Sequence, residues 1–370
     1  MLPRVSATIT IPKRELQRVF ANLQAAGLTL IGPTLRQNTI ILAEIASVDD
    51  LPAGWADEQT PGRYKTRPAA QSDWFGYAVG PGAWQGFLYP PRVSLFRAKA
   101  DGSSIDVDAT QEPPPRYALI GVRPCDLQAL RIADRVLLGG PFQDPHYASR
   151  RNGAFLFAVN CSRPSSNCFC SSMGCGPRSA GAFDLAATEL DDALVLEVGS
   201  DAGSNAMEGT AWTASTARDL DRAAEVIRQA ERAITRDVRT DHLRSFLFEN
   251  LESPHWKDVA SRCLGCGNCT MVCPTCFCTT VTDSIGLSER TERIRLWDSC
   301  FNGEFSHVHG GNARPSIRAR YRQWLTHKFA GYKEQFGVVG CVGCGRCITW
   351  CPAGIDVTEE LKALRATGVK

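Results

Sequence analysis

Two runs of four cysteines, each closed by a proline, have the clearest chemical meaning in this chain. Both runs follow the spacing C-x2-C-x2-C-x3-C-P, with Cys263, Cys266, Cys269 and Cys273 in the first and Cys341, Cys344, Cys347 and Cys351 in the second. This spacing is typical of proteins that bind two [4Fe–4S] clusters through cysteine thiolates. Glycines beside the cysteines allow the tight backbone turns that such a site needs.

The two runs predict crossed ligation, because the fourth cysteine of each run points away and ligates the other cluster. Cluster one then takes Cys263, Cys266, Cys269 and Cys351, and cluster two takes Cys341, Cys344, Cys347 and Cys273. A pair of zinc sites is the alternative, but zinc sites usually combine separate C-x2-C units. Clusters with crossed ligands lie close together and pass single electrons, so these residues predict electron transfer and no catalytic residue.

A third group of cysteines lies in the first half of the chain. Cys125 follows an apolar run at Arg116–Val122, and Cys161 follows another at Ala154–Val159. If these runs are neighbouring parallel strands, both cysteines sit at carboxyl ends, where sites of α/β proteins are usually built. Together with Cys168 and Cys170, they could bind a third [4Fe–4S] cluster, with Cys175 as a competing fourth ligand; scattered buried thiols are the alternative.

Three further thiols follow or flank the first motif. Cys276 and Cys278 flank Phe277, and Cys300 ends the segment Trp297–Cys300. Three thiols are one short of a complete set for a cubane, so we expect them to pack beside cluster two. The six histidines form no H-E-x-x-H or comparable motif, and we expect surface or core roles for them.

The composition narrows the class of protein. The chain has 370 residues, 16 cysteines and a formal net charge of +2, and it lacks the basic excess of a nucleic-acid-binding protein. A disulfide scaffold is usually short and secreted. We find neither a signal-peptide pattern nor an apolar run near the length of a membrane span. These observations favour a cytoplasmic protein whose thiols stay reduced and hold metal.

The pattern of apolar residues predicts a mixed α/β domain over residues 1–250. A helix is expected at Lys13–Ala26, and the expected strands are Thr39–Ile45, Arg116–Val122, Ala154–Val159 and Leu194–Val198. Segments Asp49–Gly62, Val79–Pro91 and Gly199–Ser215 are expected to be loops, and a helical stretch is expected over Ala217–Asn250. Residues 251–370 are expected to form a mainly α-helical dicluster ferredoxin domain, with an inserted helix at Ser316–Phe329.

Longer segments carry a resemblance to a known family. The chain resembles the beta subunit of cytoplasmic sulfhydrogenases, which are NAD(P)-linked [NiFe] hydrogenases, and it is similar to the equivalent relay subunit of anaerobic sulfite reductase. The segments that carry this resemblance are Leu51–Trp55, Pro61–Tyr64, Val79–Pro81, Gly121–Asp126, Asn160–Cys161, Cys168–Gly174, Cys273–Cys278 and Trp297–Cys300, together with the second cluster motif.

The resemblance implies a non-catalytic subunit that carries iron–sulfur clusters. It would relay electrons between a flavin subunit that oxidises NAD(P)H and the small and large subunits of a [NiFe] hydrogenase. It also implies that Cys125, Cys161, Cys168 and Cys170 bind the third cluster, because the position of Cys175 is often not cysteine in the family. The equivalent relay subunit of a sulfite reductase or other flavin-linked reductase is one alternative, and a redox-sensing interaction module is another.

Overall fold

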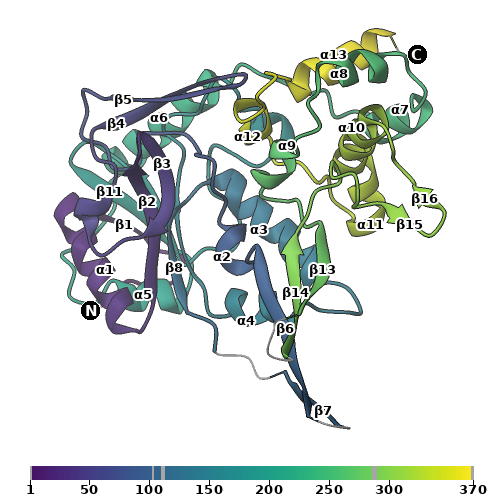
Figure 1. Ribbon diagram of the computed structural model, residues 1–370. Coiled ribbons are helices and arrows are strands. Elements are labelled where there is room, and N and C mark those ends of the chain that lie inside the picture. The colour runs from purple at the N-terminus through teal and green to yellow at the C-terminus, as the bar shows by residue number, and fades with distance from the viewer. Residues whose placement is uncertain (1, 102–103, 110–112, 286–289, 368–370) are drawn as a thin grey trace.

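A mixed β-sheet dominates the first two thirds of the chain. The computed structural model describes residues 2–101, 104–109, 113–285 and 290–367 (Figure 1). Within these residues the sheet has eight strands in the order β12-β1-β11-β10-β9-β8-β2-β3. The strands are β1 (Thr8–Pro12), β2 (Thr29–Arg36), β3 (Thr39–Glu44), β8 (Tyr117–Val122), β9 (Phe155–Val159), β10 (Leu185–Glu189), β11 (Ala193–Val198) and β12 (Thr213–Ala214).

The middle of this sheet is parallel and covered on both faces. Strand β9 pairs in parallel with β8 and β10, and β8 pairs in parallel with β2. Ile120 of β8 packs in one core with α1 (Leu16–Ala25), whereas Leu119 packs in another with α3 (Pro124–Leu137). Burial on both faces explains why β8 and β9 are continuous apolar runs.

Most predicted elements of this region are present. The expected helix is a 3₁₀ turn, η1 (Lys13–Glu15), followed by α1, and the four expected strands are β3, β8, β9 and β11. The predicted loop at Gly199–Ser215 is wrong, because it contains α5 (Asp201–Ala206) and β12. Ser200 caps α5 by accepting a hydrogen bond from the Gly203 backbone at 3.0 Å, which stabilises a helix in a sequence of small polar residues.

The stretch Ala217–Asn250 forms two helices rather than one. Helix α6 (Ala217–Ala233) ends well before α7 (Leu243–Glu249), and His242 at the start of α7 has a φ of 51°. Two predicted loops also contain regular structure. Hairpin β4 (Trp55–Thr60)–β5 (Arg63–Pro68) overlaps the first of them, and α2 (Gln85–Leu88) lies in the second.

The C-terminal part consists of short helices around an aromatic core. Trp256, Phe301, Tyr321, Trp324 and Phe329 are buried together there. The inserted helix is α10 (Ile317–Thr326), which continues into a π-helical turn, η4 (His327–Gly331). The other helical segments of the chain are η2 (Val48–Asp50), α4 (Pro145–Arg151), η3 (Cys170–Met173), α8 (His255–Arg262), α9 (Asn268–Met271), α11 (Tyr332–Phe336), α12 (Arg346–Thr349) and α13 (Val357–Thr367).

A second sheet joins the N-terminal and C-terminal parts of the chain. Its order is β13 (Thr279–Ile285), β14 (Arg290–Trp297), β6 (Arg92–Asp101) and β7 (Ser104–Asp108), and it projects downward as an arm in Figure 1. Sequence reasoning did not predict the β13–β14 hairpin between the two cysteine motifs. A small hairpin, β15 (His307–Val308)–β16 (Gly311–Asn312), follows it.

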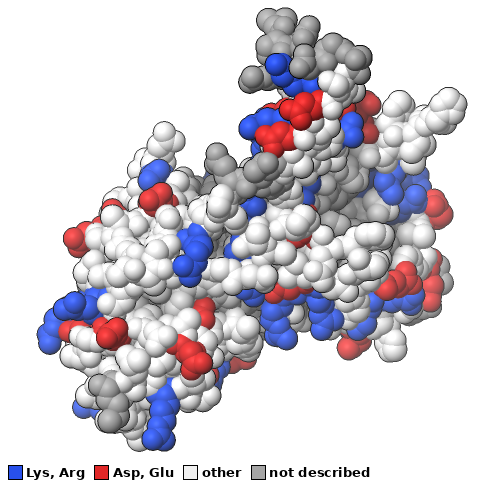
Figure 2. Space-filling view, turned by 90° about the horizontal axis from the view of Figure 1, so that it is seen from below, with Lys and Arg blue, Asp and Glu red and all other residues white. Residues whose placement is uncertain are grey.

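The surface charge is mixed, in keeping with the low net charge. Figure 2 shows acidic and basic side chains interspersed over the face seen from below. None of the helices in the described ranges is long and apolar enough to cross a membrane.

Candidate iron–sulfur cluster sites

The predicted ligands of cluster one surround one cavity. Cys263 follows the last residue of α8, and Cys269 lies in α9. A cavity is lined by Cys263, Cys266, Cys269 and Cys351, with Cys347 also in its wall. The structure therefore brings the fourth cysteine of the second motif to the first three cysteines of the first, as crossed ligation requires.

The glycines of both motifs have the conformation that the turns demand. Gly265 and Gly267 have φ values of 65° and 76°, and Gly343 and Gly345 have values of 66° and 75°. A Cβ atom at Gly343 would lie 2.5 Å from the carbonyl oxygen of Phe169. The backbone amides of Gly265 and Gly343 point at the thiols of Cys263 and Cys341, each at 3.4 Å. The two motifs therefore fold into the same local turn.

The predicted ligands of cluster two are also gathered. Cys341, Cys344 and Cys347 all lie close enough to Cys273 for their charges to interact. Burial raises the pKa of the thiols of Cys341, Cys344 and Cys347. Neutral thiols are thus the stable form in the metal-free fold, and each must exchange its proton for iron when a cluster binds.

The spacing of the thiols is unlike that of a single zinc ion. Ligands of one zinc lie about 2.3 Å from the metal, so their sulfurs are within about 4 Å of one another. Among the described residues, the group of three His, Cys, Asp or Glu ligand atoms within 4.8 Å of one another is His255, Asp258 and Glu360, which contains no cysteine. A cubane holds its thiolates farther apart, and the donor set fits it better.

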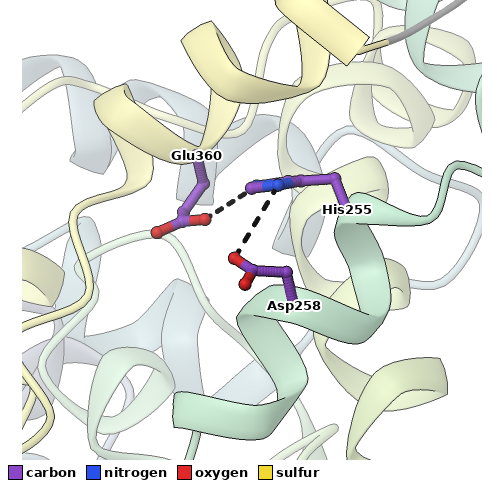
Figure 3. Close-up of side chains that lie close together, drawn as sticks. All are labelled: His255, Asp258 and Glu360. Atoms are coloured by element: carbon purple, nitrogen blue, oxygen red, sulfur yellow. Dashed lines mark hydrogen bonds and ion pairs between the residues drawn. The ribbon is translucent and has the colours of Figure 1, made fainter.

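Figure 3 shows that His255–Asp258–Glu360 group. His255 and Glu360 are joined at 2.8 Å, and the guanidinium of Arg262 binds Glu360 at 3.0 Å and Asp258 at 3.1 Å. Because Arg262 already pairs with both carboxylates, the group links α8 to α13. Helix α8 ends directly before Cys263 and α13 begins soon after Cys351, so this link holds the segments that carry two predicted ligands of cluster one.

The third group of cysteines lies where the parallel sheet predicts it. Strands β8 and β9 are parallel neighbours; Cys125 is in the first turn of α3 after β8, and Cys161 comes two residues after the end of β9. Cys170 lies close enough to Cys161 and Cys168 for their charges to interact, and Cys125 lies similarly close to Cys170. Burial raises the pKa of the Cys168 thiol to about 12.

A buried arginine supports an anionic group at this third site. Arg123 is 2% exposed, and its Nη2 donates to the carbonyl oxygens of Phe75 at 2.6 Å and Tyr77 at 2.8 Å. Its Nε has no hydrogen-bond partner, and its electrostatic neighbours include Cys161 and Cys125. A buried guanidinium is costly unless a negative charge faces it. The carboxylates of Asp57 and Glu189 already interact with Arg123, and thiolates that bind iron would add negative charge next to it.

Cys175 lies close to this group but makes different contacts. Its Sγ is 2.9 Å from the carbonyl oxygen of Val342 and 3.6 Å from that of Cys170. These contacts are those of a neutral thiol that donates a hydrogen bond to the backbone, and burial raises its pKa to about 12. The geometry thus favours Cys175 as a packing residue.

A buried ion pair, missed by sequence reasoning, ties the second and third thiol groups together. Arg346, between Cys344 and Cys347, binds Asp126 at 2.8 Å and 3.1 Å, and their side chains are 2% and 3% exposed. The Arg346 Nε also donates to the carbonyl oxygen of Gly80 at 3.0 Å. The sequence did contain a hint of this pair, because Asp126 directly follows Cys125 and Arg346 directly precedes Cys347.

The remaining thiols, Cys276, Cys278 and Cys300, lie near the ligands predicted for cluster two. Cys276 is within hydrogen-bond reach of Cys273, and Cys278 is within reach of Cys300. The buried side chain of Lys328 is an electrostatic neighbour of all three.

These thiol groups define an iron–sulfur protein with a dicluster domain. A family profile described as a 4Fe-4S dicluster domain matches residues 262–355, the segment that holds both complete motifs. The chain therefore carries [4Fe–4S] clusters.

A curated relative identifies the family more closely. Over 283 residues the chain is 34% identical to "Sulfhydrogenase 2 subunit beta" of Pyrococcus furiosus, and the match covers 75% of this chain and 81% of the relative. The chain belongs to the family of sulfhydrogenase beta subunits, as the resemblance implied. No solved structure was found to match it. The family and the dicluster domain together support a role in electron transfer.

Proposed function

We propose that this chain is the relay subunit of a multisubunit oxidoreductase, in which it conducts electrons between a [NiFe] hydrogenase module and an NAD(P)H-oxidising flavin subunit. Bound [4Fe–4S] clusters supply the chemistry, which is the transfer of single electrons. The observation that carries the proposal is the convergence of thiols from distant segments into adjacent groups. The relative is named as a subunit of a sulfhydrogenase, and this name motivates the choice of partners.

The ligand assignment is part of the proposal. Cys263, Cys266, Cys269 and Cys351 hold cluster one, and Cys341, Cys344, Cys347 and Cys273 hold cluster two. Cys125, Cys161, Cys168 and Cys170 hold a third cluster, for which the main support is the buried Nε of Arg123, which has no hydrogen-bond partner.

In this proposal the three clusters adjoin one another as a row. The Phe169 amide donates to the Gly343 carbonyl oxygen at 2.8 Å, so the loop of Cys168 and Cys170 packs directly on the second motif. Cys168 Sγ lies 3.8 Å from the carbonyl oxygen of Cys344. Cluster two therefore lies between the other two sites, since it shares crossed motifs with cluster one.

Cluster one is the end of the row that is nearest to solvent. Cys266 is exposed, and the neighbouring side chains of Leu264 and Met271 are 67% and 39% exposed. In contrast, Cys344 and Cys170 are buried. Because a partner must approach a redox centre closely to exchange electrons with it, we place one docking surface around Leu264.

Two measurements test this function. Anaerobically purified complex should contain about twelve irons and twelve sulfides in this chain if three cubanes are present, and about eight of each if only the dicluster motifs are loaded. Cys266→Ala and Cys344→Ala should each abolish electron flow from NAD(P)H to the terminal acceptor, while the partner flavin still accepts hydride. Full activity in both variants would refute the relay.

The metal content of the partners separates the alternatives. Nickel in the copurified complex supports the hydrogenase assignment, whereas siroheme in a partner would move the chain to a sulfite reductase. A redox sensor would instead bind its partner in only one redox state.

A further inference from the structure

Two cysteine thiols at the foot of the β13–β14 hairpin lie against each other. The Asp298 amide extends the ladder of this hairpin by donating to the Cys278 carbonyl oxygen at 2.8 Å. Cys300 follows two residues later, in a turn. Its thiol and its backbone amide both hydrogen-bond to the Cys278 Sγ. A disulfide bond joins sulfurs about 2 Å apart, so it forms between thiols that can already contact each other, as these two do.

The pair has no metal ligands around it and belongs to no predicted cluster. The third thiol nearby, Cys276, hydrogen-bonds instead to Cys273, whose sulfur is assigned to the iron of cluster two. Among the described residues, no further His, Cys, Asp or Glu ligand atom joins Cys278 and Cys300 to form a set of three within 4.8 Å. The two thiols therefore remain available to react with each other.

The surroundings make the two thiols chemically unequal. The hydrogen bond from the Cys300 thiol, together with the positive charge of Lys328, lowers the pKa of the Cys278 thiol to about 7. The same hydrogen bond and burial raise the pKa of the Cys300 thiol. Thiol–disulfide chemistry starts from a thiolate, because the thiolate and not the thiol is the nucleophile. A thiolate beside a neutral thiol is thus the arrangement of a reactive pair.

A buried ammonium supplies a fixed positive charge to this pair. Lys328 is 4% exposed and lies in the π-helical turn η4, a type of irregularity that often occurs at functional sites. Its Nζ donates to Thr275 Oγ1 at 2.6 Å, and its charge interacts with Cys278 and Cys300 as well as with Cys273 of cluster two. The ammonium stabilises the thiolate where water screens charge little.

The pair also lies directly beside the first cluster motif. The Thr270 and Ser299 hydroxyl oxygens are 2.7 Å apart, and a Cβ atom at Gly267 would lie 2.9 Å from the Ser299 hydroxyl. The next residue, Cys300, is close enough to Cys269, a predicted ligand of cluster one, for their charges to interact. An electron therefore has only a short distance to cross between the pair and cluster one.

We propose that Cys278 and Cys300 form a redox-active dithiol–disulfide pair that exchanges two electrons with the proposed row of clusters. On oxidation, the Cys278 thiolate and the Cys300 thiol form one S–S bond, release one proton and give up two electrons, which leave singly to the neighbouring oxidised clusters. Reduction of the disulfide reverses each of these changes. The source and sink of the electrons rest on the relay function proposed above, whereas the formation of the disulfide does not.

The first test maps thiols in the wild-type chain, in the complete complex. Anaerobic samples are poised at a series of potentials with redox mediators, quenched with an alkylating reagent and analysed by mass spectrometry. Cys278 and Cys300 should lose alkylation together and appear as one linked peptide, and the ratio of disulfide to dithiol should change tenfold per about 30 mV, as two electrons require. Cys175, a buried thiol in contact with carbonyl oxygens, should be alkylated throughout. Full alkylation of Cys278 and Cys300 at every potential would overturn the proposal.

Single variants separate this pair from a metal site and from the relay itself. Cys278→Ser and Cys300→Ser should each abolish the linked peptide and keep the iron content of wild type, and a loss of about four irons in either would overturn the proposal. In a reductive titration, wild type and the control Cys175→Ser should take up two more electrons per chain than Cys300→Ser. A disulfide couple in a complex that passes no electrons to its flavin would support the pair while refuting the relay. Electron flow without the couple would refute the pair alone.

Discussion

The buried pair Asp126–Arg346 allows a quantitative test of how the second and third thiol groups are held together. We consider Asp126→Asn, which keeps the side-chain volume and removes the negative charge. Burial lowers the pKa of Arg346, but Asp126 and Cys344 more than offset this effect, so the net pKa is raised. Because arginine stays protonated in proteins, the guanidinium remains charged in the variant, with its two hydrogen bonds to residue 126, at 2.8 Å and 3.1 Å in the wild type, weakened.

Removal of one partner from a buried ion pair costs about 3–5 kcal/mol, because it leaves an uncompensated charge. If the pair breaks before the transition state of unfolding, this cost speeds unfolding by about two to four orders of magnitude. The assay is the anaerobic bleaching rate of cluster absorbance in urea. The control is Asp192→Asn, which breaks an exposed pair with Arg222 at 2.6 Å and should change the rate little.

The double variant Asp126→Leu, Arg346→Met separates two explanations. If the charges of Asp126 and Arg346 mainly compensate each other, replacement of both by apolar side chains should restore most of the stability. If the Arg346 charge mainly compensates the thiolates of cluster two, the double variant should bleach as fast as the single one. A bleaching rate for Asp126→Asn equal to that of the surface control would refute the reasoning altogether.

Three further outcomes are expected. Gly343→Ala should destabilise cluster two, because the new Cβ would lie 2.5 Å from the Phe169 carbonyl oxygen and the backbone φ is 66°. The control Gly140→Ala, whose Cβ would point into open space, should not destabilise it. Iron retention after gel filtration measures the effect of both variants. Lys328→Met should lower the midpoint potential of cluster two, since a nearby positive charge favours the reduced state, and a potential unchanged in a redox titration would contradict this. Because burial raises the pKa of Cys168 to about 12, its thiolate is lost as the pH falls, and chelators should strip iron faster at lower pH; a pH-independent rate would argue against thiolate ligation.

The parts of the site that sequence could predict are those encoded in local spacing. Both dicluster motifs have ligands within eleven residues of one another, so the turn that positions them is a local property. The position of Cys125 and Cys161 also followed from local rules, because each comes after an apolar strand and the two strands are parallel neighbours. The division of the chain at residue 250 stays a prediction, and strand β6 pairs with β14 across it.

What sequence could not predict depends on contacts between distant segments. Asp126 and Arg346 are 220 residues apart, and neither residue alone differs from a surface charge. The proximity of Cys278 and Cys300 depends on the register of a hairpin whose turn lies outside the described residues. The helix within Gly199–Ser215 was missed for another reason, because a serine cap outweighed the poor helix propensity of the residues that follow.

The buried cations show a common arrangement that links these observations. Arg123 faces Cys161 and Cys125, Arg346 faces Cys344, and Lys328 faces the thiols around the foot of β13. Each cubane with four thiolates carries net negative charge, and burial of that charge is unfavourable without compensation. Cluster one opens to solvent, and its neighbouring Arg262 is already paired with two carboxylates. Water can compensate charge there, whereas Arg123, Arg346 and Lys328 lie beside thiols that are cut off from solvent; another buried cation, Arg295, is paired with Asp144 instead.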